Sequence, residues 1–255
     1  MPSERENTIL VVDVGRTSYD ACWEMQRELV ELRASGRVPD LLLLTEHPHV
    51  YTIGKTGNEK HLRVRRSELE RDGIPVVHTD RGGDITYHGP GQLVGYPILD
   101  LHCILPDLDR YLRGLEEIIM RALDRFSLRG SRMEGYTGVW VGEEKICAIG
   151  IKTTRWITMH GFALNVTTDL SYFAKIIPCG ISDRGVTSME RRLGRPVRMS
   201  DVASVVGNEF VSYFGYRKAE GGMSALLQLL EGVGIRRAGL SGEQSQFHGE
   251  YEVTV

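Results

Sequence analysis

The sequence predicts a mixed α+β fold built around a central sheet. Short apolar, β-branched runs typical of strands occur along most of the chain, and at least three longer segments repeat apolar residues at helical spacing. The two kinds of element do not alternate regularly, as the strand–helix–strand units of a doubly wound sheet would. An α+β or mixed-sheet α/β fold is therefore expected, and not a Rossmann fold.

The composition is that of an ordinary globular protein. The chain has 255 residues, of which 41% are hydrophobic and 25% charged, enough to bury a core without disulfides. We expect one domain over residues 1–217 and an extension of unknown role over residues 218–255. A net charge of −3 argues against nucleic acid as a partner. No apolar run reaches the roughly 20 residues that cross a membrane, and the polar N-terminus lacks signal-peptide order, so a cytoplasmic location is expected.

The first part of the chain predicts a strand, a helix and a strand pair. Residues 9–14 are apolar and β-branched, and residues 19–34 form an amphipathic helix that Ser18 can cap. Residues 41–44 are a fully apolar run typical of a buried strand. We expect residues 49–54 to pair with that strand.

Glycine and proline dominate residues 81–92, RGGDITYHGPGQ. Four glycines and a proline exclude a long regular element, yet chemically capable side chains lie among them. Reactive or polar side chains in a loop indicate function more strongly than side chains in the core do. The segment matches neither the Walker A pattern nor G-x-G-x-x-G, so no nucleotide site is indicated. Residues 93–101 then predict a buried strand.

The remaining elements are a helix, a β-hairpin, a strand and two further helices. Asp107 is expected to cap the first helix, which is strongly amphipathic. Ser200 is expected to cap the second. The predicted bounds are 107–126 for the first helix, 137–141 and 145–151 for the hairpin, 156–166 for the strand, and 200–214 and 224–230 for the last two helices.

Four cysteines are candidate nucleophiles, because their irregular spacing fits neither a zinc ribbon nor a disulfide framework. Cys22 lies on the apolar face of a predicted helix, and Cys103 has no activating neighbour in sequence. Cys147 lies within a predicted strand. Cys179 lies between a proline and a glycine, a loop context in which backbone can approach a substrate. Local sequence leaves both Cys147 and Cys179 open.

A reactive cysteine needs a neighbour that stabilises its thiolate. Lys145 opens a predicted strand after a turn, and its ammonium group could lower the pKa of a thiol. Strand alternation places Lys145, Cys147 and Ile149 on one face, which favours Cys147 as the partner of Lys145. The alternative interpretation is an ordinary solvated lysine.

Among the histidines, His88 is the best candidate to line a site, because it lies in the glycine-rich segment. His47 and His49 flank a proline, but no third metal ligand follows at a recognised spacing. No metal site is expected.

Four segments together resemble the lipoyl(octanoyl) transferases, which belong to the fold superfamily of the lipoate and biotin protein ligases. The segments are RGGDITYHGPGQ at 81–92, KICAIG at 145–150, HGFALN at 160–165, and PCGI at 178–181 followed by GVTS at 185–188. The resemblance covers roughly residues 9–215. It implies a ligase-like catalytic domain with a mixed central sheet, a smaller sheet and flanking helices.

The resemblance implies roles for individual residues by position. Cys179 would carry the acyl group as a thioester, and Lys145 would lower the pKa of that thiol, while Cys147 would be a strand residue beside the site. The implied substrate-binding residues are Arg81, Gly82, Gly83, Asp84, Ile85, Thr86, Tyr87, His88, Ala148, Ile149, Gly150, Gly161, Phe162 and Ala163.

The resemblance also implies partners. Octanoyl-acyl carrier protein would be the donor, and lysines of the lipoyl domains of 2-oxo acid dehydrogenases and of the glycine-cleavage H protein would be the acceptors. No ATP, metal or other cofactor is expected, because the phosphopantetheine thioester is already activated. The arginines of residues 63–71 and 191–198 are docking candidates for acidic partners, or simply solvated faces.

Three rival functions remain open at the level of sequence. The first is an ATP-dependent ligase of the lipoate or biotin type, which would form an acyl-adenylate and no adduct on Cys179. The second is an amidotransferase that moves octanoyl or lipoyl between two proteins, also through a cysteine. The third is a non-catalytic module that binds carrier protein.

Overall fold

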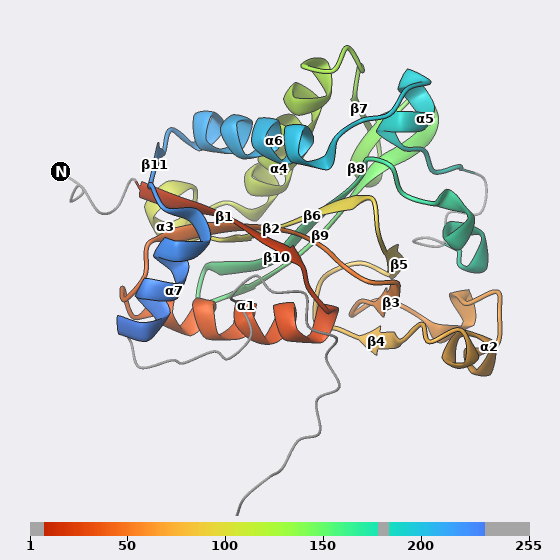
Figure 1. The fold of residues 1–255 in the computed structure, drawn as a ribbon, viewed down its shortest axis with the longest axis horizontal. Helices are drawn as coiled ribbons and strands as arrows, with labels where there is room; N and C mark the ends of the chain where they lie inside the picture. The colour runs from red at the N-terminus through yellow and green to blue at the C-terminus, as the bar shows by residue number, and fades with distance from the viewer. Residues whose placement is uncertain (1–7, 178–183, 233–255) are drawn as a thin grey trace, which may run out of the picture.

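A computed structural model describes residues 8–177 and 184–232. Within these residues the chain forms two sheets flanked by helices (Figure 1). The larger sheet has 8 strands, in the order β11-β1-β2-β6-β10-β9-β8-β7. These strands are β1 (Thr8–Arg16), β2 (Asp40–Glu46), β6 (Gln92–Ile98), β7 (Ser131–Met133), β8 (Tyr136–Val141), β9 (Glu144–Thr154), β10 (Ile157–Asn165) and β11 (Arg217–Lys218).

The larger sheet is mixed. β1 pairs in parallel with β2 and β11, and the other neighbours in the sheet are antiparallel. β2 lies between β1 and β6, and its leucines alternate between two cores: Leu41 and Leu43 face one, Leu42 and Leu44 the other. A strand buried on both faces has no polar side to show, which explains the fully apolar run in the sequence.

The smaller sheet contains β3 (Val50–Ile53), β4 (Val76–His78) and β5 (Ile85–His88). β3 pairs in parallel with β4 and antiparallel with β5. The expected pairing of residues 49–54 with residues 41–44 is therefore wrong. Both edges of β2 are already occupied by β1 and β6, so β3 has to leave the larger sheet. It pairs instead with a strand inside the glycine-rich segment.

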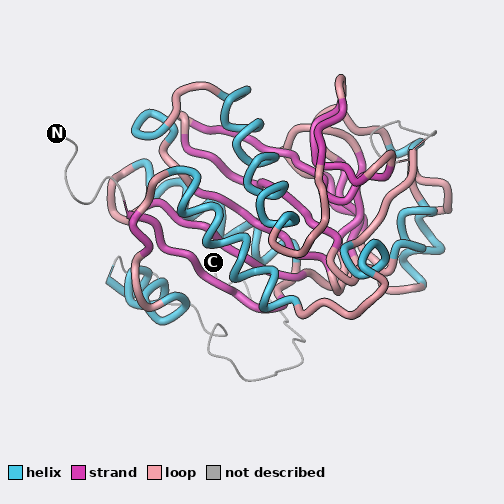
Figure 2. Tube along the Cα trace, turned by 90° about the horizontal axis from the view of Figure 1, so that it is seen from above, coloured by secondary structure: helices cyan, strands magenta, loops and turns pink. Residues whose placement is uncertain are grey.

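Helices cover both faces of the larger sheet. They are α1 (Tyr19–Ala34), α2 (Arg66–Arg71), α3 (Leu101–Ile104), α4 (Leu108–Asp124), α5 (Met189–Leu193), α6 (Met199–Phe214) and α7 (Gly222–Gly232), with 3-10 turns η2 (Glu59–His61) and η3 (Leu170–Lys175). In Figure 1, α4 and α6 lie above the sheet, and α1 and α7 lie below it. Figure 2, seen from above, shows helices in front of the long strands.

The predicted caps are confirmed for two helices and wrong for one. The Ser18 hydroxyl accepts a hydrogen bond from the backbone N–H of Ala21, and the Asp107 carboxylate accepts one from the N–H of Arg110. The N-cap of α6 is Arg198, which makes no side-chain cap bond. Ser200 lies inside the helix, whose first turn is instead supported by Asp201, an acid at the positive end of the helix dipole.

Two apolar cores lie on opposite faces of the larger sheet. Residues of α4 and α6 pack in one core, and residues of α1 pack in the other. Helix α7 contributes Leu226 and Leu230, both buried, to the α1 core. Helix α7, which belongs to the predicted extension 218–255, thus packs against the α1 core.

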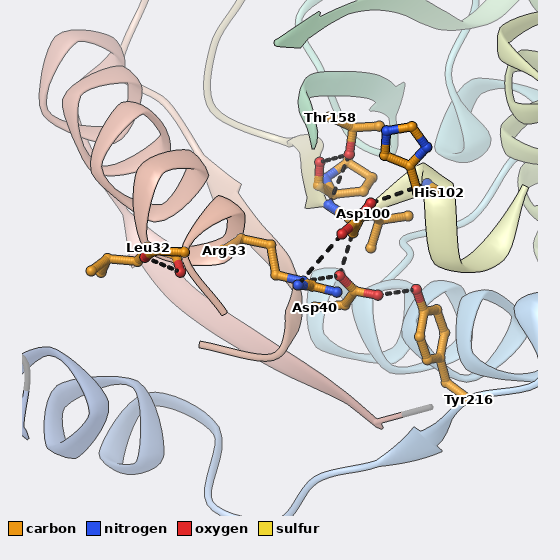
Figure 3. A network of polar contacts seen from close by, with 10 residues as sticks. Leu32, Arg33, Asp40, Asp100, His102, Thr158 and Tyr216 are labelled. Carbon is orange, nitrogen blue, oxygen red and sulfur yellow. Dashed lines mark hydrogen bonds and ion pairs between the residues drawn. The ribbon is translucent and has the colours of Figure 1, made fainter. Parts of the chain in front are cut away.

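A buried carboxylate ties several elements together at the α3 end of the sheet (Figure 3). Asp40 Oδ1 accepts hydrogen bonds from Arg33 Nε at 2.6 Å and from the backbone N–H of Asp100 at 2.9 Å. Asp40 Oδ2 accepts one from the Tyr216 hydroxyl at 2.6 Å. Burial raises the pKa of Asp40, and the Arg33 guanidinium opposes that rise. This network joins the end of α1, the start of β2 and the segment after α6.

Candidate active site

A pocket lies between the two sheets, on the α1 face of the larger sheet. Side chains two residues apart on a strand share a face, and the floor of the pocket follows this rule. It consists of Gln92, Val94 and Tyr96 from β6, Gly161, Ala163 and Asn165 from β10, and Ala148 and Gly150 from β9.

The centre of this floor is made of very small residues. Gly161 lies directly opposite Gly150, and Ala163 lies opposite Ala148. A Cβ atom at Gly161 would lie 2.2 Å from the Gly95 carbonyl oxygen, and one at Gly150 would lie 2.8 Å from the Gly82 oxygen. The backbones therefore approach as closely as glycine allows, and an apolar slot runs along the strands between them.

The roof of the slot is the start of the glycine-rich segment. Arg81 is buried, and its guanidinium donates to the Thr52 carbonyl at 2.8 Å and to the Asp84 carbonyl at 2.7 Å. The N–H of Gly82 donates to the Ile151 carbonyl at 2.8 Å. These bonds hold residues 81–84 across β9, so the arginine of the motif shapes the roof.

A chain of hydrogen bonds fixes His88 in the wall. The Gln92 side-chain N–H donates to Asn165 Oδ1 at 2.9 Å, and Asn165 Nδ2 donates to the Thr187 carbonyl at 3.0 Å. Gln92 Oε1 is left to accept from His88 Nδ1 at 2.8 Å. Nδ1 therefore carries the proton. Burial lowers the pKa of His88 well below 6.5, so the imidazole is neutral, and its ring stacks on Tyr19.

His160 forms one end of the slot in a strained conformation. Its φ of 57° is in the left-handed region, which costs a non-glycine residue on the order of 1 kcal/mol or more. Its backbone N–H donates to Gln26 Oε1 at 2.8 Å, and its Nε2 lies 2.7 Å from Asp80 Oδ1. Burial lowers the pKa of His160 to about 4, although Asp80 opposes this.

Lys145 lies at the other end of the slot. Its Nζ donates to the Thr137 carbonyl at 3.2 Å and lies 4.9 Å from the ring centroid of Trp140. Its backbone N–H donates to the Gly185 carbonyl, and its carbonyl accepts from Thr187 N–H, both at 3.0 Å. The described segment that follows Cys179 in sequence therefore lies beside Lys145.

The expectation that Lys145 and Cys147 share a face is wrong, because β9 contains a β-bulge between them. Val139 pairs with Cys147 and Trp140 pairs with Lys145, so Ile146 is an extra residue in β9. Ile146 and Cys147 consequently both enter the core on the α4 side, while Lys145 lines the pocket. One inserted residue resets the alternation on which the sequence argument depended.

The structure separates the candidate cysteines. Cys147 is fully buried, and burial raises the pKa of its thiol far above the ordinary range. Cys22 is also buried, and Cys103 is exposed. Cys179 lies outside the described residues, so its predicted role stays a prediction.

Most of the predicted binding residues line the pocket, but Asp84 and Tyr87 do not. The Asp84 carboxylate lies 2.5 Å from His61 Nδ1 and accepts a hydrogen bond from the backbone N–H of Asn58. Tyr87 lies on β5 of the smaller sheet, and its ring stacks on Tyr172 of η3. The predicted residues that do line it are Arg81, Gly82, Gly83, Ile85, Thr86, His88, Lys145, Ala148, Ile149, Gly150, Gly161, Phe162 and Ala163.

Several pocket residues were not predicted. Alternation along β6 and β10 could have found Gln92, Val94, Tyr96 and Asn165, because they share a face with residues that were predicted. Tyr19 from α1, Phe173 from η3 and Val186 reach the pocket only through the tertiary fold. No local pattern in the sequence points to them.

Residues 8–177 and 184–232 contain no cluster of three or more histidine, cysteine or acidic side chains placed to hold a metal ion. In the same part of the chain, no helix combines the length and apolar character needed to cross a membrane.

Comparisons with known proteins identify relatives by sequence and by fold. Two relatives named octanoyltransferase are 52% identical over 203 residues (Rubrobacter xylanophilus; 79% of this chain, 91% of the relative) and 50% identical over 199 residues (Chloroflexus aggregans; 77% and 90%). They confirm the resemblance predicted from the four motifs, and with it the class of enzyme, an acyltransferase.

Solved structures with low identity share the fold. A bipartite lipoate protein ligase from Thermoplasma acidophilum superposes with a TM-score of 0.66 at 18% identity, covering 88% of this chain and 91% of that one. A putative lipoate protein ligase from T. acidophilum with bound lipoic acid gives 0.65 at 16%, covering 89% and 95%. The model of the lipoyl protein ligase A/B catalytic domain matches residues 18–211. The chain therefore belongs to the lipoyl protein ligase A/B catalytic domain family.

Proposed function

We propose that this protein transfers an octanoyl group from octanoyl-acyl carrier protein to a lysine of a lipoyl domain, through a thioester on Cys179. The observation that carries the proposal is the apolar slot that ends at Lys145, beside the segment that follows Cys179 in sequence. The octanoyltransferase relatives support the same cargo.

The slot suits a linear acyl chain. Its floor offers glycine and alanine side by side, and Val94 and Ile85 add apolar surface. The acyl chain would lie along β9 and β10, with its carbonyl near Lys145 and its tail toward His160. Each buried CH₂ group contributes about 0.8 kcal/mol, so the slot would favour a chain that fills it.

The first half of the reaction would be thioester exchange. The Cys179 thiolate attacks the carbonyl carbon of the donor thioester, and the phosphopantetheine thiolate leaves and takes up a proton. The Lys145 ammonium supports this step, because a nearby positive charge favours the thiolate over the thiol. His88, which is neutral and buried, shapes the wall and does not supply charge.

The second half would be aminolysis. The neutral amine of the acceptor lysine attacks the Cys179 thioester, an amide bond forms, and the cysteine leaves as a thiolate. The proton lost by the amine goes to solvent or through Lys145. A thioester is more activated than an amide, so the proposed sequence needs no ATP, no metal and no other cofactor.

The candidate docking surface for the donor is the loop between η2 and α2. Arg66 forms ion pairs with Glu59 and Glu70. In the second arginine run, Arg192 forms an ion pair with Glu144. Arg63 and Arg65 are exposed, and the backbone N–H of Arg63 donates to the Lys175 carbonyl, four residues before Cys179. We propose that Arg63 and Arg65 meet an acidic surface of the carrier protein.

The experiment that separates the rival functions is a transfer assay with a purified lipoyl domain. Octanoyl-acyl carrier protein is supplied without nucleotide, and the mass of the lipoyl domain is followed. We expect an octanoyl amide under these conditions. A ligase would modify the domain only with free octanoate and ATP. An amidotransferase would require an octanoylated or lipoylated protein as donor, and a binding module would produce no amide under any condition.

A further inference from the structure

One peptide group connects Lys145 to a buried carboxylate on the far side of β8. The carbonyl of Thr137 accepts the hydrogen bond from Lys145 Nζ at 3.2 Å. The N–H of Gly138, which belongs to the same peptide group, donates to Glu116 Oε1 at 3.0 Å. The order of groups is therefore carboxylate, peptide N–H, peptide C=O, ammonium. A peptide held between an anion and a cation in this order is polarised in the direction that strengthens both hydrogen bonds.

Glu116 makes this contact from within the core. It lies on α4, and its side chain is fully buried. Its second oxygen, Oε2, accepts from Arg113 Nη1 at 2.7 Å and from Arg132 Nε at 3.0 Å. Both arginine side chains are partly exposed, Arg113 at 55% and Arg132 at 38%. The two arginines compensate the buried charge from one side, and Oε1 is left for the Gly138 N–H.

The backbone at Gly138 admits only glycine. Its φ is +123°, and a Cβ atom there would lie 2.5 Å from the Cys147 carbonyl oxygen. This position is next to the bulge that takes Lys145 off the core face. The charged and titratable groups around the contact are Glu117, Arg113 and Arg132 on the α4 and β7 side, and Lys145 and Cys147 on β9.

We propose that Glu116 is a positioning residue for Lys145. It acts through the 137–138 peptide, holding the Thr137 carbonyl in place to bind the ammonium group at the mouth of the acyl slot. Glu116 does not line the pocket, so it acts on Lys145 and not on substrate binding. The expected effect on catalysis rests on the proposed function. The positioning of Lys145 does not, because the hydrogen bonds that carry it join only described residues.

The direct test is the reactivity of the Lys145 amine toward an amine-acetylating reagent, measured site by site by peptide mass spectrometry at fixed pH. In Glu116→Gln, the amide oxygen is a weaker acceptor than a carboxylate and cannot serve Gly138 and both arginines at once. We expect Lys145 to be labelled several-fold faster than in the wild type. We also expect kcat to fall about tenfold or more, as misplacement of a catalytic group does, with KM for the octanoyl donor unchanged.

Arg113→Gln is the matched control. It weakens the same buried cluster but leaves the carboxylate on Gly138, so it should lower thermal stability without changing Lys145 labelling or kcat. If Glu116→Gln does not fold, Glu116→Asp is used in its place, because it keeps the charge on a shorter side chain. We then expect Lys145 labelling to be about twofold to threefold faster than in the wild type.

The outcomes separate this inference from the proposed function. Unchanged labelling of Lys145 in a folded Glu116 variant overturns the positioning role, whatever the enzyme does. A change of equal size in Arg113→Gln overturns it as well, because the effect would then be general loosening of α4. Absence of octanoyl transfer by the wild-type protein contradicts the proposed function and leaves the labelling result intact.

Discussion

His47 couples a single proton to the stability of the fold. It is fully buried, with Nδ1 at 2.6 Å from the Thr17 carbonyl and Nε2 at 2.7 Å from the Tyr96 hydroxyl. A carbonyl only accepts, so Nδ1 carries the proton and Nε2 accepts from the tyrosine. Burial lowers the pKa of His47 to about 4, and the bond to Thr17 opposes this. The neutral ring is therefore the form that the fold requires.

This depressed pKa predicts a loss of stability in weak acid. Between pH 6.5 and about 4 the unfolded chain binds a proton at His47 that the folded chain does not, so the free energy of unfolding falls as pH falls through that window. The full effect of this residue is roughly 3 kcal/mol. In His47→Gln, we expect a shallower pH dependence of urea unfolding over the same window. The exposed His78→Gln variant is the control, and an equal change in both variants would contradict the role of His47.

Single residues also show what a local sequence pattern can and cannot indicate. The small residues Gly150, Gly161 and Ala163 were predicted at the site, and all three line the slot. The prediction that Lys145 and Cys147 share a face was wrong, because the bulge depends on how β9 pairs with β8. Nothing within residues 145–150 indicates that pairing. A local pattern fixes which side chains are small or polar, but not which face a bulged strand turns toward the pocket.

At the scale of elements, β9 and β10 together form much of the floor of the slot. Their opposed pairs, Ala148 with Ala163 and Gly150 with Gly161, line one face of the sheet. On the other face, Leu164 enters the α4 core. The slot and the core are thus separated by the thickness of one sheet.

Chain-length preference should follow from this arrangement. Loss of two buried CH₂ groups costs about 1.6 kcal/mol, so kcat/KM for a hexanoyl donor should be about 15-fold below that for octanoyl. In Ala163→Val, the added methyl groups occupy the slot, and we expect the octanoyl preference to shrink or reverse. Leu164→Ile is the control, since its side chain lies in the core on the other face. Equal use of both donors by the wild type would contradict a closed slot.

Element boundaries were predictable where one strand or helix contains its own signal. The bounds of α1 and α4 follow from apolar spacing and from Ser18 and Asp107. The place of β3 in the smaller sheet was not predictable, because it depends on β1 and β6 already covering both edges of β2. Sheet membership is a property of the completed topology.

At the scale of the whole molecule, the slot lies between two sheets, and Arg63 and Arg65 lie in the loop that joins η2 to α2. If these arginines receive an acidic carrier protein, Arg63→Glu with Arg65→Glu should raise the donor KM several-fold at low salt. The effect should shrink as salt is added, because exposed charges are screened over roughly 10 Å at 0.1 M. The rate with a small octanoyl thioester should stay unchanged.

The matched control for this charge reversal is Arg110→Glu. Arg110 is exposed near the start of α4. In Figure 1, α4 lies above the larger sheet and α2 lies beside the smaller sheet. The Arg110→Glu change should leave the donor KM unaltered. If Arg110→Glu raises KM as much as the Arg63 and Arg65 variant does, the effect is one of net charge, and the docking surface is misplaced.

Intact-protein mass spectrometry can detect the proposed thioester on Cys179 without any assumption about the acceptor. The wild-type protein and the variants Cys179→Ala and Cys147→Ala are each mixed with octanoyl-acyl carrier protein in the absence of acceptor. We expect an octanoyl adduct on the wild type and on Cys147→Ala, because the Cys147 thiol is buried on the far side of the sheet. We expect none on Cys179→Ala. An adduct that persists in Cys179→Ala and disappears in Cys147→Ala would contradict the proposed thioester on Cys179.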